Sequence, residues 1–331
     1  MIKKGFSYFL MLLIVFGLLI TLSIFVYLAT PPSYAKNPKT IEVPQGTHFT
    51  HVADTLKKEG IIKSIWGFSL LVGYLQGTTQ IKAGEYLFNT DMLPLEVAEI
   101  LLKGKVLQYG VTIPEGYTIY QIADLLHRSK FTIKEKFLES CYNPLLLSSW
   151  GIKGDSLEGY LFPDTYKLPR NIDEKGILTL MLSRFKNVYN EKYAEKANKL
   201  GFSMKDVVTL ASIIEKETGK PSERPLISAV FHNRLKKRIR LQSDPTAIYG
   251  LNDFKGKIRK RHLKRDTPYN TYIHSGLPPG PIANPGEASI RAVLYPAEVD
   301  YLYFVSKNDG SHHFSNNLNE HNRAVWKYQK R

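Results

Sequence analysis

A long uncharged segment near the N-terminus sets the first limit on how this chain folds. The 24 residues from Phe6 to Ala29 carry no charge, and Lys3 and Lys4 precede them. A helix of about 20 apolar residues spans the hydrocarbon core of a bilayer, whereas the apolar core of a cleavable signal peptide has about 7 to 15 residues. The sequence therefore predicts a transmembrane helix at residues 6–29, preceded by a cytoplasmic N-terminus at residues 1–5.

The two lysines also predict the orientation of this helix. By the positive-inside rule they keep the N-terminus in the cytoplasm, so the chain after Pro31 lies outside. The alternative is a long signal peptide cleaved after Ser33-Tyr34-Ala35, whose small residues partly resemble a processing site. We expect a single-pass protein of the cytoplasmic membrane whose remaining chain lies outside the cytoplasm.

Composition narrows the class of protein further. The chain has 331 residues, 43% of them hydrophobic, which is enough for two or three compact domains. Its single cysteine, Cys141, excludes an intramolecular disulfide and a multi-cysteine zinc site. The net charge of +15 would suggest nucleic acid for a cytoplasmic protein, but nucleic acid is scarce outside the membrane. We therefore expect no nucleic-acid partner.

The positive charge is concentrated between Arg234 and Arg265. This segment contains twelve lysines and arginines but only two acidic residues, Asp244 and Asp253. Such a run usually forms a solvated face. It could also attract anionic lipid headgroups or acidic cell-wall polymers. The sequence leaves these interpretations open.

A short pattern occurs twice after a proline-containing linker at residues 30–40. VPQG at residues 43–46 returns as IPEG at residues 113–116, and each copy precedes apolar residues at helical spacing. Each copy predicts a strand, a Pro-x-Gly turn and a helix that begins near Thr47 or Thr118.

A further strand at residues 81–88 would close the first copy into a sheet. We therefore expect two small α+β modules, at residues 41–108 and 109–150. They could serve as spacers or as polymer-binding units.

Aromatic rings and carboxylates gather at residues 157–166 (LEGYLFPDTY). Aromatic faces stack on sugar rings while carboxylates bind sugar hydroxyls, although such turns are often ordinary core. Glu158 and Asp164 are therefore candidate sugar-binding residues.

A helix is predicted over residues 204–218, with Ser203 as N-cap, Asp206 as its capping-box partner and Gly219 after its end. On a helical projection one stripe of this helix is apolar and two glutamates flank it. The stripe consists of Val207, Leu210, Ala211, Ile214 and Thr218.

The two glutamates have different predicted surroundings. Glu217 shares its side of the helix with Ile213, Lys220 and Arg224, which is typical of an exposed or ion-paired carboxylate. Small or apolar residues lie on the side of Glu215, leave room for a substrate and provide no counter-charge. A carboxyl kept protonated in this way can donate a proton to the leaving oxygen of a glycosidic bond. Glu215 is therefore the candidate acid, and the alternative is a glutamate on the helix surface.

Six motifs follow one another in the second half of the chain. They are LASIIEKET at 210–218, ER at 223–224, FHNRL at 231–235, LQSDPTAIYG at 241–250, TPYNTY at 267–272 and GLPPGPIANPG at 276–286. In this order they resemble the MltG, or YceG-like, family of endolytic murein transglycosylases. The resemblance runs from the anchor to residues 302–305 and implies an α+β catalytic domain at residues 151–331, which includes a strand at 301–305 beside the helix of Glu215. The first repeat copy resembles a divergent LysM module, a fold associated with N-acetylglucosamine-containing glycans.

The resemblance implies a mechanism for Glu215, the first glutamate of the IIEKE stretch. It would protonate the oxygen between N-acetylmuramic acid and N-acetylglucosamine and then take the proton of the muramic C6 hydroxyl. The product is a 1,6-anhydromuramyl end, and no second carboxylate is needed. The family's motif positions suggest sugar contacts for four further residues, each of which could equally stabilise a turn. These residues are Gln242, Asp244, Asn270 and Tyr272.

The implied partners are peptidoglycan strands, the membrane and peptidoglycan synthases, with a role in ending strand growth. A muramidase with a second carboxylate and a non-catalytic peptidoglycan-binding scaffold remain as alternatives. No metal-ligand spacing and no Gly-rich phosphate loop occur in the sequence, so we expect no metal and no cofactor.

Overall fold

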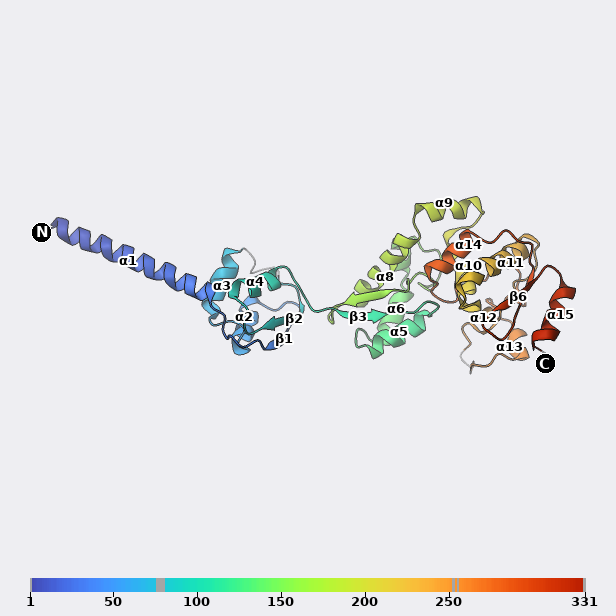
Figure 1. Cartoon of the computed structure of the whole chain (residues 1–331), viewed down its shortest axis with the longest axis horizontal. Helices are drawn as coiled ribbons and strands as arrows, with labels where there is room; N and C mark the ends of the chain where they lie inside the picture. The colour runs from blue at the N-terminus through green and yellow to red at the C-terminus, as the bar shows by residue number, and fades with distance from the viewer. Residues whose placement is uncertain (1, 76–80, 252–253, 255, 330–331) are drawn as a thin grey trace. The chain divides into compact units, whose positions relative to one another are not determined.

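The computed structural model describes residues 2–75, 81–251, 254 and 256–329. The chain forms two compact units (Figure 1). The first unit contains Met1–Tyr109 and Lys167–Asn171, and the second contains Gly110–Tyr166 and Ile172–Arg331. Each unit is described by itself.

The first unit begins with helix α1 (Ile2–Ala29). Its segment Tyr8–Ala29 has 22 residues, is strongly apolar and carries no charge, and the rest of the protein buries none of its most apolar stretch. By length and composition it can cross a membrane, so α1 fits the predicted anchor.

The rest of the first unit is a small α+β module. Strand β1 (Pro38–Val43) pairs antiparallel with β2 (Gly84–Asn89), so the predicted second strand of this sheet is confirmed. Helices α2 (Phe49–Lys58), α3 (Ile65–Tyr74) and α4 (Pro94–Leu102) complete the module and share its apolar core with the two strands.

The second unit begins with a strand, three helices and a second strand. Strand β3 (Tyr109–Thr112) is followed by the helices α5 (Ile119–Arg128), α6 (Lys134–Cys141) and α7 (Pro144–Ser149). Strand β4 (Thr165–Leu168) comes next along the chain and pairs with β3. Because β4 closes this sheet, the segment with the aromatic run at 157–166 belongs to the same module.

The two copies of the repeat match in structure. The turn glycines Gly46 and Gly116 adopt φ values of +77° and +74°, a region that glycine enters at little cost. Helices α2 and α5 bury the same four positions of the repeat. The helix starts differ, because Thr118 caps α5 through its side chain whereas Thr47 donates its hydroxyl to the carbonyl of Pro44 and His48 stands at the N-cap of α2.

Helix α10 (Met204–Glu217) is central to the second unit. Ser203 and Asp206 form the predicted capping box at its start. The predicted apolar stripe is incomplete, because every residue from Val207 to Ile214 is buried. The cause is tertiary packing: α9, α11, α12 and α14 all contact this helix.

The remaining elements surround α10 or extend away from it. They are α8 (Glu174–Val188), α9 (Glu191–Lys199), the 3-10 helix η1 (Pro221–Glu223), α11 (Arg224–Lys236), α12 (Asp244–Ile248), α13 (Lys260–Leu263), α14 (Glu287–Leu294), β5 (Tyr303–Ser306), β6 (His312–Ser315) and α15 (Leu318–Gln329). The predicted strand at 301–305 corresponds to β5, which pairs antiparallel with β6. Its helix neighbours are α11 and α15, with Phe304 edge-on to Phe231 of α11.

Candidate active site

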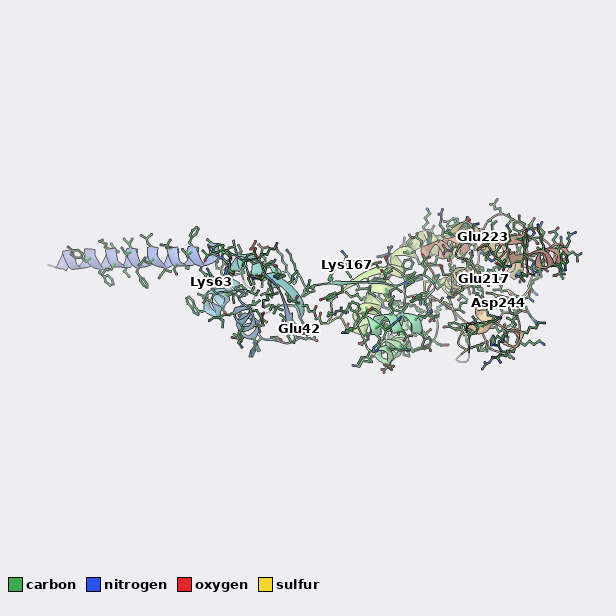
Figure 2. All side chains as sticks on the ribbon, turned by 60° about the horizontal axis from the view of Figure 1, so that its bottom comes forward. Glu42, Lys63, Lys167, Glu217, Glu223 and Asp244 are labelled. Carbon is green, nitrogen blue, oxygen red and sulfur yellow. The ribbon has the colours of Figure 1, made fainter. Side chains whose placement is uncertain are left out.

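The end of α10 carries the two glutamates of the IIEKE stretch. Glu215 and Glu217 are separated by about 200° around the helix axis, so their carboxyl groups enter different surroundings. Figure 2 labels Glu217 together with Glu223 and Asp244 in the second unit.

Glu215 is held in an ion-pair cluster. Its side chain is 6% exposed, Oε1 lies 2.9 Å from Nη2 of Arg224, and Oε2 accepts a hydrogen bond of 3.0 Å from the backbone N–H of Gly286. The predicted absence of a counter-charge at Glu215 is therefore wrong. Arg224 was expected on the Glu217 side, but the η1 turn between α10 and α11 brings it to Glu215 instead.

Glu115, from the second copy of the repeat, completes this cluster. Its Oε2 lies 3.4 Å from the same Nη2 of Arg224. Burial and the charge of Glu215 raise the pKa of Glu115, and Arg224 opposes this. A Cβ at Gly286 would lie 1.9 Å from Oε1 of Glu115, so a side chain there would displace the Glu115 carboxyl. The cluster thus joins α10, the IPEG turn and the start of α14.

Glu217 faces a cavity of about 500 Å³. The hydroxyl of Ser243 donates a hydrogen bond to its Oε1. Burial raises the pKa of Glu217 to about 7, Asp244 contributes in the same direction, and Ser243 and Arg234 oppose the shift. The prediction of an exposed or ion-paired Glu217 is wrong, because α10 has no exposed face on that side. Instead this carboxyl has the protonation behaviour of a general acid near neutral pH.

Three of the four predicted sugar-binding residues from the family motifs line the same cavity. These are Gln242, Asp244 and Tyr272. The hydroxyl of Tyr272 donates to Oδ1 of Asp244 at 2.6 Å. Gln242 has a φ of +50°, which is strained for a residue with a side chain, and its Oε1 lies 3.4 Å from Nη1 of Arg234. Their amide, carboxyl and phenol groups can bind sugar hydroxyls beside Glu217.

Asn270 does not line the cavity. Its side chain is fully buried, and its Nδ2 donates to the carbonyls of Leu263 and Arg265. Its Oδ1 accepts from the backbone N–H of Tyr272. Asn270 therefore stabilises the turn that presents Tyr272, which is the alternative that the sequence left open.

Glu158 also has a structural environment. It is 2% exposed and accepts hydrogen bonds from the backbone N–H of Ile119, from Nδ2 of Asn284 and from the hydroxyl of Tyr249. Burial raises its pKa to about 8, against these three donors. Three donors of the protein already occupy the carboxyl group of Glu158, so its role is structural and the expected contact with sugar is not supported.

Asp164 lies away from the cavity as well. It accepts from Nε of Arg184 at 2.6 Å and from the backbone N–H of Thr165. The hydrogen bonds with Arg184 and Thr165 lower its pKa although burial opposes this. An ion pair with Arg184, rather than a sugar, explains this carboxylate.

The sequence analysis did not identify Arg234 as a site residue. It is buried, donates from Nε to the carbonyl of Leu302 and from Nη1 to the carbonyl of Leu241, and lines the cavity. Arg234 is the first residue of the basic segment 234–265. Because it is buried, the interpretation of that segment as a solvated face is wrong for this residue. Its place in the FHNRL motif was the one signal that set it apart.

His312 and His321 line the cavity too. The sequence analysis singled out neither histidine as a site residue. Among the described residues no cluster of three or more His, Cys, Asp or Glu side chains is arranged to hold a metal ion.

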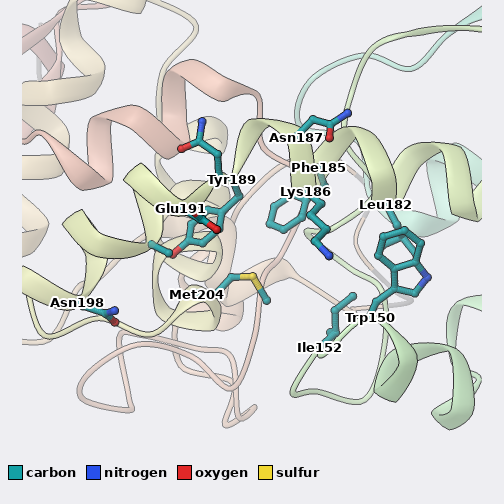
Figure 3. Close-up of a pocket in the computed structure, with 12 residues that line it drawn as sticks. Trp150, Ile152, Leu182, Phe185, Lys186, Asn187, Tyr189, Glu191, Asn198 and Met204 are labelled. Atoms are coloured by element: carbon teal, nitrogen blue, oxygen red, sulfur yellow. The ribbon is translucent and has the colours of Figure 1, made fainter.

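A larger cavity of about 710 Å³ lies elsewhere in the second unit (Figure 3). Aromatic and apolar side chains such as Trp150, Phe185 and Tyr189 line it. The one carboxylate among its described lining residues, Glu191, is exposed at the start of α9. Size alone therefore does not identify the reactive site, because this cavity offers no buried acid.

Comparisons with known proteins give a consistent picture. Residues 41–327 match the model of the YceG-like family. A protein of Bacillus subtilis named endolytic murein transglycosylase is 35% identical over 314 residues, which cover 89% of this chain and 86% of the relative. A protein of the same name from Streptococcus pneumoniae is 29% identical, and the alignment covers 88% of this chain but 58% of that longer relative. A crystal structure of a yceG-like protein from Listeria monocytogenes has 35% identity and a TM-score of 0.60, and covers 88% of this chain.

Proposed function

The chain belongs to the YceG-like family, and we propose that it is an endolytic murein transglycosylase whose acid/base is Glu217. In this proposal it cleaves the bond between N-acetylmuramic acid and N-acetylglucosamine within peptidoglycan strands and leaves 1,6-anhydromuramyl ends. The name of the Bacillus subtilis relative supports the activity. The choice of Glu217 over Glu215 rests on the geometry of α10.

The observation that carries the proposal is the carboxyl of Glu217, with a pKa raised to about 7, at the wall of a polar cavity. Such a carboxyl can still hold a proton for the leaving oxygen near neutral pH. At Glu215, by contrast, Arg224 and the backbone N–H of Gly286 already contact the two carboxyl oxygens. We therefore transfer the acid/base role from the first glutamate of the motif to the second.

The reaction follows from the properties of this carboxyl. Glu217 donates its proton to the glycosidic oxygen as the bond to C1 of the muramic residue breaks. The muramic C6 oxygen then bonds to C1 and releases its proton, which restores Glu217. Because no water enters, a second carboxylate is not required to activate one. Gln242, Asp244 and Tyr272 hold the sugar hydroxyls and acetamide groups during this exchange.

Product analysis with matched variants tests this proposal. Purified sacculi are digested with the wild-type protein, with Glu217→Gln and with Glu215→Gln, and the muropeptides are weighed by mass spectrometry. We expect anhydro ends from the wild type, a loss of about 10²- to 10⁴-fold in rate for E217Q, and substantial activity in folded E215Q.

The other outcomes have clear meanings. Loss in E215Q with activity kept in E217Q would return the acid role to Glu215. Reducing ends, one water heavier than anhydro ends, would identify a muramidase. A wild-type protein that binds sacculi without releasing muropeptides would be a binding scaffold.

We also propose the location in which this reaction occurs. α1 fits a membrane anchor, and Lys3 and Lys4 before it favour a cytoplasmic N-terminus with both globular parts outside. Anchoring would hold the enzyme where new strands leave the membrane, next to peptidoglycan synthases, so that cleavage ends strand growth. Protease digestion of intact spheroplasts tests the orientation, since a protected catalytic unit would reverse it.

For the β1–α2–α3–β2 module we propose binding to glycan, in line with its predicted likeness to LysM modules. The module places two small helices between its antiparallel strands, and these elements share one apolar core. A pull-down of the protein on sacculi, with and without added chitin oligosaccharides, tests this role. Unchanged binding in the presence of the competitor would contradict it.

A further inference from the structure

His312 forms a close pair with Glu223. Nδ1 of His312 lies 2.7 Å from Oε2 of Glu223, and the backbone N–H of His312 donates to Oε1 at 3.0 Å. The His312 side chain is 12% exposed and the Glu223 side chain 9%. Glu223 thus fixes both the first residue of β6 and the orientation of its ring.

This pairing determines which ring nitrogen is free. A carboxylate only accepts hydrogen bonds, so Nδ1 of His312 carries the hydrogen toward Glu223. In the neutral ring Nε2 then has the lone pair. No residue that the structure describes bonds this nitrogen, while Phe304 packs edge-on against the ring with a centroid separation of 5.5 Å.

The position of the ring gives this nitrogen a possible use. His312 lines the cavity that Glu217 also lines, although the two residues come from β6 and α10. An imidazole oriented by a carboxylate and open to a substrate cavity is the arrangement that general bases adopt in hydrolytic enzymes. The Glu217 mechanism described above uses one carboxyl for two proton transfers and leaves this imidazole without a role.

On the basis of the function proposed above, we propose that His312 is a second catalytic residue, which removes the proton of the muramic C6 hydroxyl while Glu223 positions it. Glu217 gives its proton to the glycosidic oxygen, the bond from C1 to that oxygen breaks, and the C6 oxygen bonds to C1. His312 Nε2 receives the proton of the C6 hydroxyl. Transfer of this proton through solvent to Glu217 restores both groups.

A pair of substitutions separates this role from a structural one. His312→Asn places an amide N–H where Nδ1–H stood, so it keeps the contact with Glu223 and removes Nε2. His312→Ala removes the whole ring and leaves space for added imidazole. The adjacent His313→Asn is the matched control, because His313 also lies on β6 but does not line the cavity.

Each variant is measured for kcat, KM and thermal midpoint with the membrane-anchored protein in detergent and glycan strands as substrate. We expect H312N to lose about 10²- to 10⁴-fold in kcat, with little change in KM or thermal midpoint, and H313N to resemble the wild type. Imidazole should restore part of the activity of H312A. Wild-type kcat in H312N would overturn the proposal, and so would a loss in H312A that imidazole leaves unchanged together with a lowered thermal midpoint.

Failure of this inference differs from failure of the proposed function. If the wild type makes anhydro ends and H312N makes them equally fast, Glu217 alone transfers both protons. If the wild type makes no anhydro ends, the transglycosylase proposal itself fails.

Discussion

Two carboxylates that lie two residues apart at the end of α10 have different surroundings. Glu215 lies against a guanidinium and a backbone N–H, whereas Glu217 enters a cavity where a single hydroxyl and a nearby guanidinium only partly offset its burial. Desolvation without full compensation favours the neutral acid, which is the form that a glycosidic bond requires from its proton donor. At the scale of the residue, the partner of each carboxyl therefore decides its role more than its position in the motif does.

The raised pKa of Glu217 predicts a pH-dependent effect on stability. The ordinary pKa of 4.5 applies to the unfolded chain and about 7 to the folded protein, so the folded state binds the extra proton between these values. Stability from this group is present below pH 4.5 and is lost as pH rises through 7, with a total of at most about 3 kcal/mol. The Glu217→Gln variant has no titrating group at this position, so it does not lose this stability as the pH rises. Urea unfolding of both proteins at about pH 5 and about pH 8 should show E217Q gaining stability relative to the wild type at the higher pH. An equal difference at both values would contradict the raised pKa.

The close approach of Glu115 to Gly286 gives a second prediction at this scale. In Gly286→Ala the new Cβ meets the Glu115 carboxyl, which must leave its place beside Arg224. We expect a cost of about 1 to 3 kcal/mol in the free energy of unfolding. The control is Glu115→Ala with and without G286A, because removal of the carboxyl should make the alanine nearly neutral. Additive effects of the two substitutions would show that the clash is not the cause.

At the scale of the element, the sequence predicted what depends on local spacing. The strand–turn–helix repeat follows from two Pro-x-Gly turns and the apolar positions after them, and the capping box of α10 follows from Ser203 and Asp206. The residues beside Glu217 along the helix did not predict its surroundings. Helices α11, α12 and α14 pack around α10, and the sequence of α10 alone does not show where they lie. The pairing of Arg224 with Glu215 depends on the direction of the chain after η1, which no helical projection contains.

Glu158 provides a prediction about how elements are held together. Its carboxyl accepts from the start of α5, from Asn284 before α14 and from Tyr249 after α12. Glu158→Ala leaves three buried donors without an acceptor, so we expect a loss of about 3 kcal/mol or more in unfolding free energy. Asp164→Ala, which breaks a partly exposed ion pair, should cost about 1 kcal/mol or less. Similar losses in the two variants, measured by urea unfolding, would show that Glu158 does not link these elements.

At the scale of the whole molecule, the anchor and the chemistry lie in different units. α1 belongs to the first unit, while Glu217, its cavity and the Glu223–His312 pair all belong to the second. The described residues that line the cavity all come from the second unit, and we therefore predict that the chemical step proceeds without the membrane. On the proposed location, the anchor would raise the local concentration of the enzyme at the membrane surface.

Removal of α1 therefore predicts a separation of location from activity. A variant that starts at Asn37 should be found in the soluble fraction and should cleave purified strands with a kcat within about threefold of the wild-type value in detergent, because a variant that keeps the cavity intact keeps the barrier to the chemical step. In cells the same variant should release fewer anhydro ends, since its effective concentration at the membrane falls. Sedimentation and mass spectrometry of muropeptides measure both effects, with the full-length Glu217→Gln protein as the inactive control. A large loss of kcat on purified strands would mean that α1 contributes to the catalytic fold itself. The prediction that α1 affects only the location of the enzyme would then be wrong.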